Sequence, residues 1–123
     1  MLNREQLYGR AAEALAAEHL RGMGYTILEH NFRTPVGEID LIARQGGVLV
    51  FVEVKSRRTH RRGNPKYAVS PAKQRKISMT ALTYLKKHHQ THCRARFDVV
   101  TVQQEDACAR IEVIPNAFEL AYD

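Results

Sequence analysis

Acidic and basic residues of the types that bind metal ions and phosphates lie close together near the middle of the chain. Residues 37–43 contain Glu38 and Asp40, and residues 50–55 contain Glu53 and Lys55. Carboxylate oxygens are hard ligands that suit Mg²⁺ or Mn²⁺. A lysine beside them can neutralise negative charge that develops during a reaction. These residue types therefore indicate metal-dependent chemistry on a phosphate group.

A β-hairpin is predicted to bring the two acidic segments together. If Gly46 and Gly47 form a two-residue turn, Gln45 pairs with Val48, and a four-residue loop gives the same register. Asp40 then lies opposite Glu53. One face of this hairpin is wholly apolar and the other collects the charges; the apolar face consists of Ile39, Leu41, Ala43, Val48, Val50, Val52 and Val54. A three-residue loop would mix the faces, which the two-residue period of a strand disfavours.

Two interpretations of the charged face compete. Carboxylates directly opposite one another, roughly 5 Å apart, destabilise a sheet, and a divalent cation would remove that repulsion. The alternative is a salt-bridge cluster in which Lys55 neutralises Glu38 and Asp40 at a sheet edge. An isolated Glu-x-Lys would favour this alternative, but an aspartate in register beside it favours a functional site.

The charge distribution points to an anionic partner. Residues 54–97 hold thirteen of the nineteen Lys and Arg residues and none of the thirteen acids. Nucleic acid and an acidic membrane surface both fit this asymmetry, and a solvated basic face is the simpler alternative. We expect a nucleic acid, in contact with Arg57, Arg58, Arg61, Arg62, Lys66, Lys73, Gln74, Arg75 and Lys76.

The last four of these residues fall in the first turns of a predicted helix. Ser70 is a good N-cap and Pro71 a good first helical residue. Cations near a helix N-terminus cost roughly 0.3–1 kcal/mol each. Phosphate binding would explain why Lys73, Arg75 and Lys76 stand there.

The elements that must position these residues follow from periodicity and breakers. We predict helices over residues 3–23 and 70–89, and strands over residues 25–33, 36–43, 48–55, 96–102 and 109–114, with Pro115 ending the last strand and a loop over residues 56–69. The order predicts one α/β domain, residues 1–123, around a mixed sheet. The N-terminus lacks a signal-peptide core and no apolar run could span a membrane, so we expect a cytoplasmic protein with reduced cysteines and no membrane partner.

Four motifs in this order resemble the bacterial YraN-like family: Gly9 with Glu13, residues 37–42, residues 51–55 and residues 96–100. The resemblance covers nearly the whole chain. It implies a restriction-endonuclease-like three-layer sandwich, with a central mixed five-stranded β-sheet flanked by helices. Proteins of this kind belong to the PD-(D/E)xK nuclease superfamily, and archaeal Holliday-junction resolvases are similar relatives. The family is uncharacterised, so the resemblance implies a fold and a site more firmly than a substrate.

Each role implied by the resemblance maps onto one residue. Asp40 and Glu53 match the metal-binding acids, Lys55 the motif lysine, and Glu13 the acid that resolvase-like members carry on their first helix. The backbone carbonyl of Val54 would complete the ligands of one or two Mg²⁺ or Mn²⁺ ions. Ile39 stands where many members of the superfamily have proline, a departure shared by resolvase-like members.

The expected function is therefore that of a metal-dependent endonuclease that hydrolyses phosphodiester bonds in DNA. Selectivity for branched or junction DNA in repair or recombination, and a homodimeric assembly, both fit the resemblance. Two alternatives stay open. One is a nucleic-acid-binding protein of the same fold that does not cleave, and the other is an RNA-processing nuclease.

Overall fold

The computed structural model describes residues 2–57, 69–105 and 108–118. Two helices and five strands follow one another in the predicted order: α1 (Arg4–Gly22), β1 (Thr26–Arg33), β2 (Glu38–Gln45), β3 (Val48–Arg57), α2 (Pro71–Lys87), β4 (Arg94–Glu105) and β5 (Cys108–Phe118). The strands form one sheet in sequence order, and only β3 and β4 run parallel. Helix α2 lies in the connection that a parallel pair requires.

Both helices begin where the sequence predicts. The Asn3 side chain accepts a hydrogen bond from the N–H of Gln6, and the Gln6 side chain accepts one from the N–H of Asn3, which makes a capping box. Ser70 caps α2 by accepting from the N–H of Lys73, and Pro71 occupies the first turn. The first turn of α2 contains no acidic residue.

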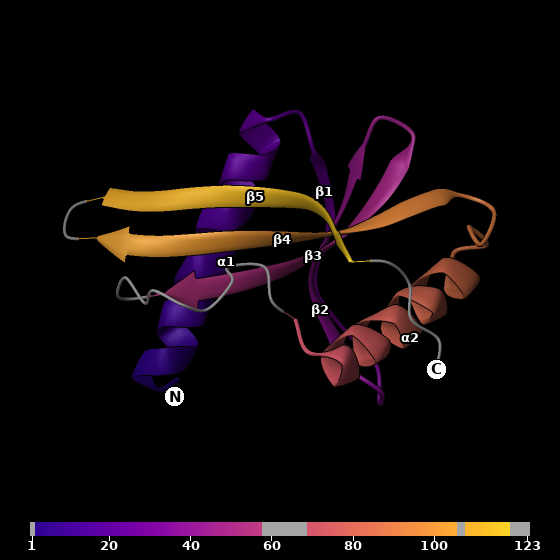
Figure 1. Cartoon of the computed structure of the whole chain (residues 1–123), viewed down its shortest axis with the longest axis horizontal. Coiled ribbons are helices and arrows are strands. Elements are labelled where there is room, and N and C mark those ends of the chain that lie inside the picture. Colours follow the sequence, from indigo (N-terminus) through magenta and orange to yellow (C-terminus); the bar gives the residue numbers. More distant parts are fainter. Residues whose placement is uncertain (1, 58–68, 106–107, 119–123) are drawn as a thin grey trace.

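The helices cover opposite faces of the sheet, which makes the predicted three-layer α/β sandwich (Figure 1). Under α1, small helix residues such as Ala12 and Ala16 pack on Leu41, Val50 and Val52. Under α2 lies a larger core, which contains Phe32, Ile39, Ile42, Phe51, Ile77, Tyr84 and Phe97. The architecture is consistent with the restriction-endonuclease-like fold. Neither helix in the described ranges is long and apolar enough to cross a membrane.

The predicted β2–β3 register is confirmed where the two strands pair. Gln45 pairs with Val48 across Gly46, which adopts a positive φ of 60°, and pairing continues to Leu41 and Val52. It stops one residue before Asp40 and Glu53. The expected continuation of this ladder to Asp40 opposite Glu53 is therefore absent from the paired residues.

The expected face assignment fails at Ile39. Leu41 lies in the core under α1, whereas Ile39, two residues earlier, lies with Phe32 in the core under α2. Regular alternation would keep Ile39 and Leu41 on one face. The alternation therefore breaks at Asp40. On the neighbouring strand Asn31, which lies between the paired residues His30 and Phe32, has a φ of 53°.

The bounds of several strands differ from the predicted ones, and β2 spans residues 38–45 where 36–43 is predicted. Strand β3 runs on to Arg57, β4 spans Arg94–Glu105, and β5 continues through Pro115 to Phe118. Proline is compatible with an edge strand at a bulge, because no ladder donor is needed there. The register of β4 and β5 shifts between Phe97 and Val99, opposite residues 115–117 of β5.

A buried carboxylate holds this bulge. Asp98 is fully buried, and its Oδ1 accepts hydrogen bonds from the N–H of Asn116 at 2.9 Å and from Nε of Arg96 at 3.0 Å. Its Oδ2 accepts one from the Tyr25 hydroxyl at 3.1 Å. Arg96 and Asp98 thus form an ion pair that belongs to a network supporting the fold.

Candidate metal and phosphate site

The acidic residues meet at the point where β2 and β3 stop pairing. There the carboxylate Oδ2 of Asp40 accepts a hydrogen bond of 2.8 Å from the backbone N–H of Val54. A side chain of β2 thus replaces the backbone group that would otherwise pair with β3. In an extended strand the N–H and C=O of one residue point to the same side. The Val54 carbonyl, the predicted backbone ligand, is therefore directed to the same side as Asp40.

Electrostatics show how crowded the carboxylates are. Burial raises the pKa of Asp40, and the charges of Glu53, Glu13 and Glu38 raise it further, so that it reaches about 7 despite the hydrogen bond from Val54. The charges of two strands and one helix therefore act on one half-buried acid. Negative charge in such excess favours a cation.

Glu13 reaches this cluster from α1. Its pKa is raised, mainly by burial and also by the charges of Glu38 and Glu53; a hydrogen bond from Asn31 and the proximity of His30 act in the opposite direction. Asn31 is the residue of positive φ in β1. Its unusual backbone conformation accompanies a side chain that binds Glu13, and sequence reasoning missed it. An asparagine inside a strand rich in β-forming neighbours was the available signal.

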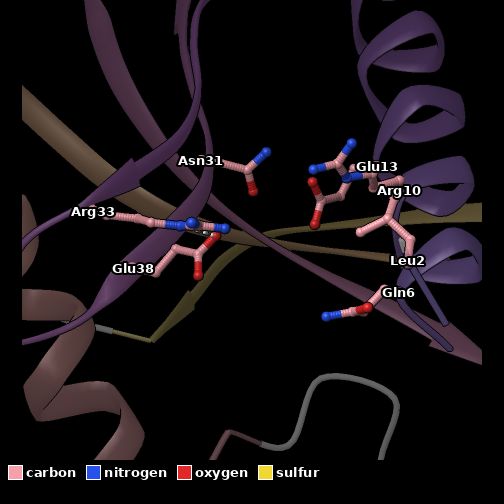
Figure 2. Close-up of a pocket in the computed structure, with 8 residues that line it drawn as sticks. Leu2, Gln6, Arg10, Glu13, Asn31, Arg33 and Glu38 are labelled. Atoms are coloured by element: carbon pink, nitrogen blue, oxygen red, sulfur yellow. Dashed lines mark ion pairs between the residues drawn. The ribbon is translucent and has the colours of Figure 1, made fainter.

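A cavity of about 240 Å³ lies beside the acids. Figure 2 shows residues of α1, among them Glu13, Arg10 and Gln6, on one side of it and residues of β1 and β2, Asn31, Arg33 and Glu38, on the other. Nε of Arg33 pairs with Glu38 at 3.4 Å. Glu13 and Glu38 are therefore reached from this cavity, so solvent has access to the margin of the acidic cluster.

Lys73 enters the cluster from the opposite face of the sheet. Its Nζ donates a hydrogen bond of 2.5 Å to Oε1 of Glu53, whose side chain is only 9% exposed. Burial lowers the pKa of Lys73, but the hydrogen bond and charge of Glu53, with the charges of Asp40 and Glu38, outweigh burial and raise it. The sequence predicted Lys73 as a nucleic-acid contact, but its ion pair with Glu53 was not foreseen.

The close approach of α2 to β2 places Lys73 there. A Cβ built on Gly37 would lie 3.0 Å from Oγ1 of Thr80 and 3.4 Å from the carbonyl oxygen of Lys76. The Thr80 hydroxyl itself donates to that carbonyl at 2.8 Å. A side chain at Gly37 would require Thr80 or the helix backbone to give way, so the glycine that precedes Glu38 allows the middle of α2 to lie this close to the sheet.

The remaining predicted site residues lie in different environments. Lys55 is half-buried and lies two residues after Glu53 in β3, where period-two alternation gives both the same face. The amide nitrogen of Gln74 donates to the carbonyl of Val69 at 2.7 Å, so it supports the start of α2. Arg75 and Lys76 are exposed. Arg58, Arg61, Arg62 and Lys66 lie outside the described residues.

The donor chemistry fits a hard divalent cation, because the cluster offers carboxylate oxygens and a backbone carbonyl. The candidate ligand side chains are not grouped around one point in the described residues, however. Over residues 2–57, 69–105 and 108–118, no three His, Cys, Asp or Glu side chains are grouped closely enough to hold a metal ion. Glu53 is engaged by Lys73, and Glu13 by Asn31. Metal binding would therefore require side-chain rearrangement.

Fold and site together define an α/β protein with a partly buried carboxylate cluster at a gap in a mixed sheet. The chain belongs to the uncharacterised protein family UPF0102, whose model matches residues 12–102. That span contains Glu13, Asp40, Glu53, Lys55 and Lys73. This confirms the predicted relationship to the YraN-like family.

Similar proteins are known from several bacteria. A UPF0102 protein of Desulfosudis oleivorans is 52% identical over 119 residues, which cover 97% of this chain and 95% of that protein. One from Syntrophus aciditrophicus is 51% identical, with 93% of this chain and 90% of that protein covered. A third, from Geotalea daltonii, is 49% identical and covers 98% and 95% of the two chains. Their names state no activity.

Proposed function

We propose that this protein is a metal-dependent nuclease that hydrolyses phosphodiester bonds in DNA. The observation that carries the proposal is the environment of Asp40. A half-buried carboxylate whose pKa is raised to about 7 by partial burial and by three other acids is costly for stability. Such an arrangement is typical of a functional site that binds a cation.

Asp40, Glu53 and the carbonyl of Val54 would hold Mg²⁺ or Mn²⁺, with Glu13 as a further ligand from α1. A divalent cation in this place would stabilise negative charge on the phosphate oxygens. Lys55 would orient the attacking water or neutralise charge as the bond breaks. Glu38, paired with Arg33, would keep the margin of the site negative.

The substrate would lie along the start of α2. The exposed cations Arg75 and Lys76 stand there without an acid in the first turn of the helix. Cations in this position bind phosphate without reading bases. The proposed selectivity is therefore for the shape of DNA, such as a branch or junction, and a base sequence is not expected to matter.

A cleavage assay tests the proposal. Single-stranded, duplex, flapped and four-way-junction DNA, with RNA alongside, would be incubated with the protein and Mg²⁺ or Mn²⁺. We expect cleavage that Asp40→Asn, Glu53→Gln and a chelator each abolish. Glu18→Gln removes one exposed acid of α1 and serves as the matched control. Activity that survives both site substitutions would contradict the proposed site.

The second candidate is a nucleic-acid-binding protein that does not cleave. The ion pair between Lys73 and Glu53 favours it, because a ligand carboxylate is already neutralised. Binding that weakens steeply with salt, without cleavage of any DNA or RNA in the assay, would support this second function. Cleavage of RNA alone would instead identify an RNA-processing nuclease.

A further inference from the structure

Lys73 is the counter-ion of Glu53, a proposed metal ligand. Its ammonium contacts Glu53 at 2.5 Å, while the Glu53 side chain is 9% exposed and that of Lys73 50%. The carboxylate is thus largely buried, and the half-exposed lysine reaches it from the first turn of α2. An ammonium in contact with Oε1 opposes the approach of a divalent cation to the same carboxylate by charge repulsion.

The position of Lys73 is unfavourable for a purely structural ion pair. It stands in the first turn of α2, where the helix dipole repels a cation. A half-exposed lysine also loses side-chain entropy when it is fixed on one partner, which leaves little net stabilisation. The close contact is therefore better explained by the surplus of negative charge around Glu53 than by a need of the helix.

Lys73 also shares its helix turns with the exposed cations Arg75 and Lys76. A lysine that leaves Glu53 would join this cationic surface, since its stem is long and half of its side chain is already in solvent. The same residue could thus serve two partners in turn, the carboxylate and a phosphate.

We propose that Lys73 is an exchangeable counter-ion, which neutralises Glu53 in the metal-free protein and moves to a nucleic-acid phosphate when a divalent cation takes the carboxylate. The inference rests on the proposed metal site. It explains why the ligand acids are not grouped for a metal in the described residues. Lys73 is in this sense a positioning residue, which makes metal loading and phosphate binding depend on each other.

Calorimetric titration with Mn²⁺, without nucleic acid, tests the exchange. Lys73→Gln removes the competing charge, so we expect it to bind Mn²⁺ about tenfold more tightly than the wild type. Lys73→Arg keeps the charge and should bind no more tightly than the wild type. Lys86→Gln removes an exposed cation from the far end of the same helix and controls for net charge.

A second measurement follows the lysine itself. In an NMR titration with Mg²⁺, the Cε–H signals of Lys73 should shift in the wild type and stay unchanged in Glu53→Gln. The proposal is overturned if Lys73→Gln binds Mn²⁺ no better than the wild type, if Lys86→Gln tightens binding equally, or if neither the wild type nor Lys73→Gln binds Mn²⁺. Tighter Mn²⁺ binding by Lys73→Gln without any cleavage would support the exchange and reject the nuclease, so the two proposals fail separately.

Discussion

The carboxylate of Asp40 accepts a hydrogen bond from the backbone N–H of Val54 at 2.8 Å, across the gap where β2 and β3 cease to pair. This bond satisfies a strand amide that the ladder would otherwise leave open. It also fixes an acid inside the sheet, among three other acids. One contact therefore joins the end of a β-ladder to the start of a candidate active site.

The metal-free protein should lose stability as the pH rises from about 4 to about 7. Burial and neighbouring acids raise the pKa of Asp40 from 3.8 to about 7 in the folded state. The folded protein therefore keeps a proton that the unfolded chain releases, so folding is penalised once the pH exceeds 3.8, and the penalty is complete above about 7. Urea unfolding with a chelator at several pH values measures it.

In Asp40→Asn this pH dependence should largely vanish. Asparagine keeps an oxygen that can accept from Val54 but carries no charge. At pH 8 without metal we expect Asp40→Asn to be more stable than the wild type, by on the order of 1–4 kcal/mol. Glu18→Gln, which changes an exposed acid, should behave as the wild type does. Equal pH profiles for all three proteins would contradict the raised pKa of Asp40 in the folded state.

Divalent cations should restore the stability that charge repulsion removes. A ligand that binds only the folded state stabilises by about 2.7 kcal/mol at a concentration one hundred times its Kd. Mg²⁺ or Mn²⁺ should therefore raise the Tm of the wild type and have little effect on Asp40→Asn or Glu53→Gln. Ca²⁺ is a useful comparison, because it prefers more ligands at longer distances. A Tm rise of the same size in Asp40→Asn would place the cation elsewhere.

Gly37→Ala should destabilise the protein by about 1–3 kcal/mol. The added Cβ would come within 3.0 Å of Oγ1 of Thr80, an atom already held by its bond to the Lys76 carbonyl. Thr80→Ala removes that atom, so the double variant should be more stable than the sum of the single effects implies. Chemical unfolding of the four proteins gives the coupling. Strict additivity would show that α2 shifts freely.

Loss of the Asp98 carboxylate should be far more damaging than loss of an exposed acid. Asp98→Ala leaves Arg96, Tyr25 and the N–H of Asn116 without their common acceptor. Removing one partner of a buried pair costs about 3–5 kcal/mol. Thermal unfolding should show the loss, with Glu18→Ala, which removes an exposed acid of α1, as the control. A loss below about 1 kcal/mol would mean that water replaces the carboxylate readily.

Local signals in the sequence were sufficient for the element order and for the pairing of β2 with β3. The glycine turn after Gln45 and the alternation of apolar residues determine that register, and both are short-range. The break at Asp40 was not predictable in this way, because the apolar pattern from Ile39 to Leu41 continues as though the strand were regular. A neighbour on β1, Asn31 at positive φ, accompanies the break.

The part of the candidate site that lies on β2 and β3 was also predictable from local signals. Asp40, Glu53 and Lys55 lie close in sequence on one hairpin, so the pairing that ends at Leu41 and Val52 leaves them near one another. The contact between Lys73 and Glu53 joins residues twenty positions apart in the chain and depends on how closely α2 approaches the sheet. That approach depends on the absence of a side chain at Gly37, which a turn-based interpretation of glycine does not foresee.

A continuous β-sheet insulates the layers on its two sides from each other, because its backbone fills the space between them. Here β2 and β3 stop pairing at Asp40, and one residue of each helix interacts with the carboxylate of Glu53. Glu13 of α1 interacts with it through charge, and Lys73 of α2 through an ion pair. The gap in the β2–β3 pairing therefore couples the two helices energetically, although they lie on opposite faces of the sheet. Substitutions at Glu13 and Lys73 should therefore be non-additive in their effects on metal affinity, and a double-mutant cycle by calorimetry would measure this communication through the sheet.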